Sequence, residues 1–107
     1  MRTQPLFAAL ALLALAGCAA DPAPHEQLRL SEQALAQARA VGATEEVPEL
    51  KMAEDKLDRA RANMASESFR DARLRAEQAE LDARLAEARV LTLKSEEQLT
   101  LLQSRVN

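Results

Sequence analysis

The sequence predicts an all-α protein, either an antiparallel helical hairpin or a three-helix bundle, with one long C-terminal helix and coiled-coil-like packing. Beyond residue 25 the chain is rich in Ala, Leu, Glu, Arg and Gln, a composition typical of helical bundles. The apolar residues of this part recur at steps of three and four, which is the spacing of one helix face. No glycine or proline follows Pro48, so no helix-breaking residue interrupts the C-terminal half.

The start of the chain is similar to an export signal. Arg2 provides a positively charged beginning, and residues 6–16 provide an apolar middle that is shorter than the roughly 20 residues needed to span a bilayer. We therefore assign residues 1–17 to a signal peptide, residues 18–25 to a short proline-containing tether, and residues 26–107 to one helical domain.

The residues Leu15-Ala16-Gly17-Cys18 resemble the lipobox of bacterial lipoprotein precursors, with a Leu three positions before the cysteine and two small residues between them. The resemblance implies cleavage between Gly17 and Cys18, diacylation of the Cys18 thiol and acylation of the new amino terminus. Residues 14–16 also fit an ordinary secretory cleavage site, which would release a soluble protein. Of the two we favour lipidation. Two or three acyl chains on one residue form a stable anchor, whereas one chain binds only marginally.

The residue after the cysteine is Ala19. In lipoproteins of this kind an Asp at that position commonly signals retention in the inner membrane. The resemblance therefore implies the periplasmic face of the outer membrane, with the inner membrane as the less favoured alternative. Because Cys18 is the only cysteine, no internal disulfide can form and the fold must depend on packing.

The charge of the processed chain excludes some partners. Without residues 1–17 it has 13 basic and 17 acidic residues, a formal charge of −4. This sign argues against nucleic acid, which requires a basic surface. Phe69 is the only aromatic residue left, which argues against base stacking and aromatic carbohydrate platforms.

Two shorter helices are predicted, over about 26–40 and 48–65. Gly42 suits the left-handed conformation that follows a helix end, and Pro48 suits a first helical turn. The apolar side of the first helix consists of Leu30, Ala34, Leu35, Ala38 and Val41. The second helix carries a heptad seam made of Leu50, Ala53, Leu57, Ala60 and Met64.

The third predicted helix, over about 68–104 and about 55 Å long, has two apolar stripes on nearly opposite sides. The alanine stripe consists of Phe69, Ala72, Ala76, Ala79, Ala83, Ala86, Val90 and Leu93. The leucine stripe consists of Leu74, Leu81, Leu85, Ala88, Leu99, Leu102 and Val106. Either the first two helices sandwich this helix, or they lie end to end along it and leave the leucine stripe as an oligomer seam. We take Leu74, Leu81, Leu85, Leu99 and Leu102 as the candidate partner or homo-oligomer interface.

No catalytic or metal site is predicted. The chain has one histidine, His25, and its one cysteine is used for lipidation, so Cys/His nucleophiles and the usual zinc sets are not expected. Gly17 and Gly42 are the only glycines and form no phosphate-binding loop. We predict a protein that is not an enzyme and has no cofactor apart from the covalent lipid.

The chain resembles a family of small α-helical lipoproteins of Gram-negative envelopes that is known only as a domain of unknown function. The resemblance extends over the whole chain, and some relatives join this module to an OmpA-like domain. The residues that carry it are Leu15 to Cys18, Pro48-Glu49-Leu50, Ala53-Glu54-Asp55-Lys56-Leu57, Phe69, and Ala76 to Ala86.

The sequence thus predicts a lipid-anchored envelope lipoprotein that acts in the periplasm as a helical spacer or adaptor. The membrane is the partner of its lipid, and envelope proteins or peptidoglycan are the other expected partners. The alternative is a small helical binding module that receives a partner helix or peptide on an exposed apolar stripe.

Overall fold

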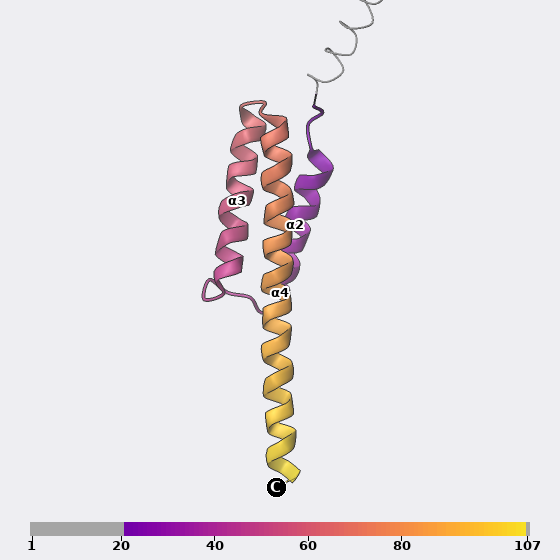
Figure 1. Cartoon of the computed structure of the whole chain (residues 1–107), viewed down its shortest axis with the longest axis vertical. Coiled ribbons are helices and arrows are strands. Elements are labelled where there is room, and N and C mark those ends of the chain that lie inside the picture. The colour runs from indigo at the N-terminus through magenta and orange to yellow at the C-terminus, as the bar shows by residue number, and fades with distance from the viewer. Residues whose placement is uncertain (1–20, 107) are drawn as a thin grey trace, which may run out of the picture.

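Three helices form the part of the chain that the structure, a computed structural model, describes, residues 21–106 (Figure 1). They are α2 (His25–Ala40), α3 (Pro48–Ala65) and α4 (Phe69–Val106). The predicted all-α class with a long C-terminal helix is confirmed. The predicted signal peptide, with Gly17, and Cys18 lie outside the described residues.

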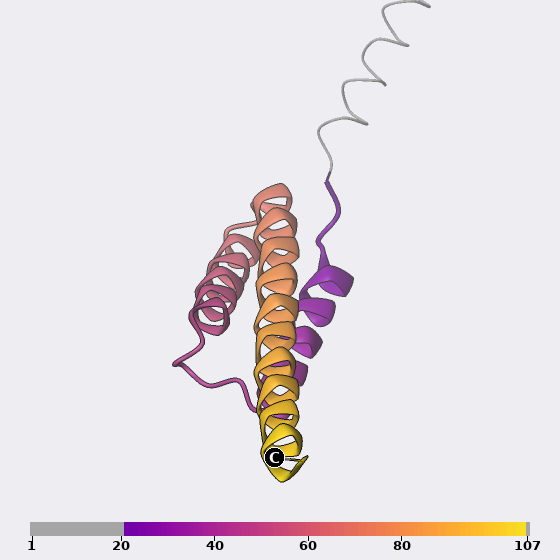
Figure 2. The ribbon, with the colours of Figure 1, turned by 60° about the horizontal axis from the view of Figure 1, so that its bottom comes forward.

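The chain runs up and down, so that α3 is antiparallel to both α2 and α4 (Figure 1). The packing centres on α4, which contacts α2 and α3 far more extensively than these two contact each other. In both views of the ribbon α2 and α3 lie on either side of α4, beside the same part of it (Figure 2). The rest of α4 extends beyond them as a single helix.

Both interhelical turns begin with the same backbone motif. After α2, the Ala43 N–H donates to the Ala38 carbonyl at 2.9 Å, and Gly42 has a φ of +110°. After α3, the Ser68 N–H donates to the Asn63 carbonyl at 2.8 Å, and Glu67 has a φ of +61°. These bonds satisfy carbonyls at the ends of the helices. Gly42 therefore has the predicted left-handed conformation, whereas Glu67 adopts it without being a glycine.

The core lies between the alanine stripe of α4 and the apolar faces of α2 and α3. From Ala72 to Ala86 the alanines of this stripe are at most 2% exposed, and the stripe ends at Val90, which is 8% exposed. The facing helices supply the large side chains, with Leu50 and Leu57 of α3 each 2% exposed and Leu35 of α2 6% exposed. Small residues on α4 thus allow two helices to approach closely while leucines from both fill the space.

Of the two predicted arrangements, the three-helix bundle with α4 between the other two helices is confirmed, except that it covers only one stripe of α4. The end-to-end arrangement is wrong, because α2 and α3 lie beside the same half of α4. The sandwich is right in placing α4 between the other two, but wrong in expecting both stripes to be covered, since both helices contact the alanine stripe. That stripe is also shorter than predicted: Leu93 is 57% exposed, because neither α2 nor α3 extends that far along α4.

Candidate interaction surface

The leucine stripe of α4 remains exposed along the helix. Its large members are between half and nine-tenths exposed: Leu74 51%, Leu81 67%, Leu85 54%, Leu99 56%, Leu102 57% and Val106 87%. Such a row is unusual for a soluble surface, where large apolar side chains are normally scattered. All five candidate interface residues therefore lie on one free face in the described part of the chain.

This face has the register of a coiled coil. With seven positions labelled a to g, position a holds Gln78, Leu85, Thr92, Leu99 and Val106, and position d holds Leu74, Leu81, Ala88, Ser95 and Leu102. We call these ten residues the leucine seam. Gln78, Thr92 and Ser95 belong to this seam but not to the predicted leucine stripe, because they are not apolar. The seven-residue repeat is the sequence signal that identifies them.

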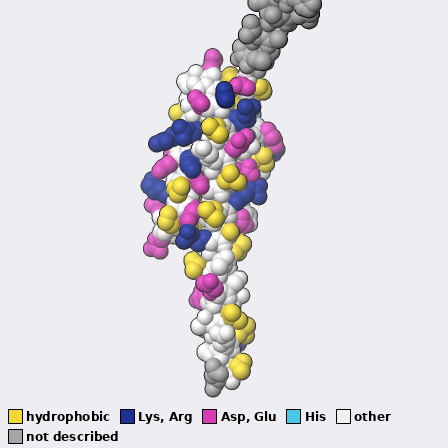
Figure 3. Space-filling view, in the orientation of Figure 1, with side chains coloured by type: hydrophobic (Ala, Val, Ile, Leu, Met, Phe, Trp, Pro, Cys, Tyr) yellow, Lys and Arg dark blue, Asp and Glu magenta, His cyan; other side chains and the backbone are white. Residues whose placement is uncertain are grey.

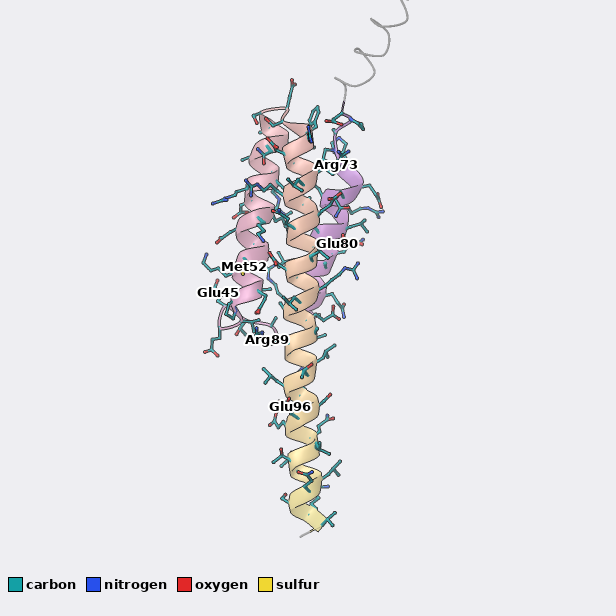
Figure 4. All side chains as sticks on the ribbon, in the orientation of Figure 1. Glu45, Met52, Arg73, Glu80, Arg89 and Glu96 are labelled. Carbon is teal, nitrogen blue, oxygen red and sulfur yellow. The ribbon has the colours of Figure 1, made fainter. Side chains whose placement is uncertain are left out.

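Ion pairs from α3 fix the charged side chains beside the seam. Lys56 Nζ lies 2.6 Å from Asp82 Oδ2, and Arg89 donates to Glu49 Oε1 at the beginning of α3. Asp82 and Arg89 are position e residues, next to the seam on the α3 side. Figure 4 shows Arg89 on α4 near the beginning of α3. The bundle thus orients these two side chains along one edge of the seam.

On the other side, α2 binds α4 through Glu80. Gln27 Nε2 donates to Glu80 Oε1 at 2.9 Å, and Arg84 pairs with Glu80 Oε2 at 2.8 Å. Both hydrogen bonds favour the charged carboxylate and lower the pKa of Glu80. Ser31 also belongs to this interface, because its buried hydroxyl lies 2.6 Å from the Ala76 carbonyl oxygen.

Glu49 is a buried carboxylate that the sequence did not reveal as such. It is 8% exposed, lies in the first turn of α3 and pairs with Arg89. A hydrogen bond from its own backbone N–H, and then the Arg89 contact, lower its pKa more than burial raises it. The residues around Glu49 gave no sign of this burial, since its partner Arg89 is 40 residues away in the sequence.

Beyond the bundle, the seam continues on a part of α4 that carries few charges. In the space-filling view this part shows mainly hydrophobic and uncharged side chains (Figure 3). A shallow hollow lined by Leu91, Thr92, Ser95, Glu96 and Leu99 lies along it. Glu96, labelled in Figure 4, occupies position e there.

Two features are absent from residues 21–106. In that range no three side chains from His, Cys, Asp and Glu are grouped so as to hold a metal ion. None of the helices described there is both long and apolar enough to cross a membrane.

Comparisons with known proteins place the chain in a family. A crystal structure of a DUF4398 family protein from Pseudomonas aeruginosa PAO1 matches with a TM-score of 0.78 and 61% sequence identity, over 79% of this chain and 88% of that one. No curated protein matches. The domain of unknown function DUF4398 matches residues 26–101, which are the three helices almost entirely. The chain therefore belongs to the DUF4398 family, as the resemblance to a helical family of unknown function predicted.

Proposed function

We propose that this chain is a non-enzymatic, lipid-anchored adaptor of the cell envelope, which uses its bundle as a spacer and its leucine seam as a helix-binding surface. The observation that carries the proposal is the exposed heptad register along α4. A helix with large apolar side chains on a free face gains stability by packing that face against another helix. The lipobox around Cys18 supports an anchor at the other end of the chain.

The direction of the chain supports the role of a spacer. Asp21, three residues after Cys18, lies beside the first turns of α4, where its carboxylate is 3.9 Å from Arg73. Val106 lies about 50 Å further along the helix, at about 1.5 Å per residue. An anchor at Cys18 would therefore leave the free part of the seam well away from the lipid.

The lipid anchor is tested by the intact mass of the full chain, produced in a Gram-negative host and purified from membranes. We expect a protein that begins at Cys18 and carries acyl chains, while Cys18→Ser yields a chain without acyl chains. An unmodified Cys18 in the wild-type protein would contradict the anchor.

The alternative is that the chain is only a small binding module for a partner helix or peptide, without the role of a spacer. The exposure of Leu99 beyond the bundle favours it specifically. A photo-crosslinking residue at position 99, in cells, should give a discrete adduct. The matched control is the same crosslinking residue at position 97, which is two residues earlier and lies on the opposite side of α4. Equal adducts from both positions would show that the seam is not the contact surface.

A further inference from the structure

We infer that the leucine seam is covered by a second copy of this chain, whose α4 runs antiparallel to the first. The inference rests on the proposed use of the seam for helix binding, but not on the lipid anchor. Three observations lead to it: the uncovered face is continuous over the length of α4, its flanking charges disfavour a parallel pair, and they favour one antiparallel register.

The flanking charges disfavour parallel pairing. In a parallel pair of helices, each position g faces position e of the next heptad in the other copy. The charged contacts would be Arg70 with Arg75, Glu77 with Asp82, and Arg84 with Arg89. All three bring like charges together, and each occurs twice in a symmetric pair. Like charges in contact oppose association.

Antiparallel pairing places position e against position e, and one register matches the charges. When Leu85 lies opposite Ala88 of the second copy, Arg75 faces Glu96 and Asp82 faces Arg89. Because the pair is symmetric, each of these opposite-charge contacts also occurs twice. The least favourable contact in this register joins Arg70 to Arg105, at the two ends of α4.

The same register matches the seam itself. Position a of one helix lies against position d of the other, in layers that pair Leu74 with Leu99, Gln78 with Ser95, Leu81 with Thr92, and Leu85 with Ala88. The polar Gln78 thus meets another polar side chain, and a leucine meets an alanine at the centre. The two helices overlap along nearly all of α4, because residue 69 lies opposite residue 104.

Neighbouring registers lose this match. Sliding the second copy by one heptad in one direction brings Asp82 against Glu96 and Arg89 against its own counterpart. Sliding it in the other direction brings Arg75 against Arg89 and Asp82 against its own counterpart. The charges therefore select both the orientation and the register.

The bundle has already ordered two of these charged groups. Asp82 is held by Lys56 and Arg89 by Glu49, and the Arg89 side chain is still 52% exposed. Contact between Asp82 and Arg89 of the second copy would join these two ion pairs across the interface. Because the side chains are already ordered, less conformational entropy is lost when they meet.

The size of the face suits a dimer that dissociates on dilution. The 38 residues of α4 extend over about 57 Å, and a strip about 10 Å wide along them gives roughly 1,100 Å² for the two copies together. Specific interfaces start at about 1,200 Å². We therefore expect a weak but specific association, with α2 and α3 of each copy on its outer side.

The association can be measured by sedimentation equilibrium of the chain from Asp21 onward, over about 1 μM to 1 mM. This chain contains every core residue described above and lacks Cys18, so the lipid plays no part. We expect a monomer–dimer equilibrium. A monomer at every concentration would overturn the inference and leave the lipid anchor to its own test by mass.

Leu99→Glu and Leu101→Glu form a matched pair of variants. Both leucines are 56% exposed, but only Leu99 belongs to the seam. We expect Leu99→Glu to weaken the dimer more than about tenfold and Leu101→Glu to change it less than about twofold. Equal effects would overturn the assignment of the seam. Helicity by circular dichroism checks that both variants fold.

Charge reversal tests the orientation. Arg75→Glu places like charges opposite Glu96 in the antiparallel register, and should weaken the dimer about tenfold. Arg75→Glu combined with Glu96→Arg restores opposite charges and should recover the wild-type dissociation constant. In a parallel pair Arg75→Glu would instead relieve its contact with Arg70, so a tighter dimer would overturn the antiparallel arrangement.

Discussion

The two faces of α4 are both apolar, yet they pack in different ways. On the alanine face, Ala83 is fully buried under α2 and α3. On the leucine face, Leu81 is 67% exposed, although it offers more apolar surface. The face with the smaller side chains becomes the core, because it lets two helices approach the backbone and insert their own leucines. The face with the larger apolar side chains stays exposed in the single chain.

The largest expected difference in stability is between a variant that truncates a leucine in the core and one that truncates a leucine on the exposed face of α4. Leu57→Ala, at 2% exposure, leaves a cavity in the core and should lower the free energy of unfolding by about 2–5 kcal/mol. Leu81→Ala removes the same atoms from an exposed site and should change it by at most about 0.5 kcal/mol. Urea unfolding of the monomer measures both.

Suppose that Leu81→Ala lowered the free energy of unfolding as much as Leu57→Ala does, at a concentration where the chain is monomeric. The leucine face would then have to be buried within the single chain. The contrast between the two faces would then be wrong. A cost that appears only at high concentration would instead reflect association, because unfolding then includes dissociation.

Replacing alanine by leucine on each face of α4 tests the same contrast in the opposite direction. Ala83→Leu adds volume where α4 is in close contact with its neighbours, and should destabilise the bundle by about 1–3 kcal/mol. Ala88→Leu makes the same change five residues later on the exposed face, and should alter stability by at most about 0.5 kcal/mol. Thermal unfolding followed by circular dichroism distinguishes them, and a similar loss for both variants would contradict tight packing of the alanine face.

Much of the fold follows from local signals. Spacings of three and four, together with Gly42 and Pro48, predicted three helices whose bounds are close to those observed. The two stripes of α4 followed from the same spacing. Periodicity cannot tell which stripe is covered, however, because a side chain that faces solvent and one that faces a helix recur at the same interval. The burial of one stripe and the exposure of the other therefore required the structure.

Features that depend on distant partners were also beyond the sequence. The burial of Ser31 depends on the Ala76 carbonyl, 45 residues away, and that of Glu49 on Arg89. Even short-range pairing follows the spacing of the charges only in part: Glu80 pairs with Arg84, four residues after it, but Asp55 pairs with Lys51, four residues before it. The left-handed conformation of Glu67 gave no signal either, because glycine is the residue expected there.

The smallest expected effect is a dependence of bundle stability on pH. The pKa values of Glu49 and Glu80 are lower in the folded chain than their ordinary values, because both carboxylates accept hydrogen bonds there. The unfolded chain therefore binds protons more readily than the folded one. The stabilisation is complete above the unfolded value of about 4.3 and is lost as the pH falls through that value towards the lower folded ones.

We therefore expect the midpoint temperature of thermal unfolding of the monomer to decrease as the pH is lowered from about 5 to about 3. The double variant Glu49→Gln and Glu80→Gln should show a shallower fall over the same range, because neither amide titrates. Both carboxylates lie where α4 contacts α2 or α3. If the midpoint temperature of the double variant fell as steeply with pH as that of the wild-type chain, the loss of stability in acid would come from groups other than these two carboxylates.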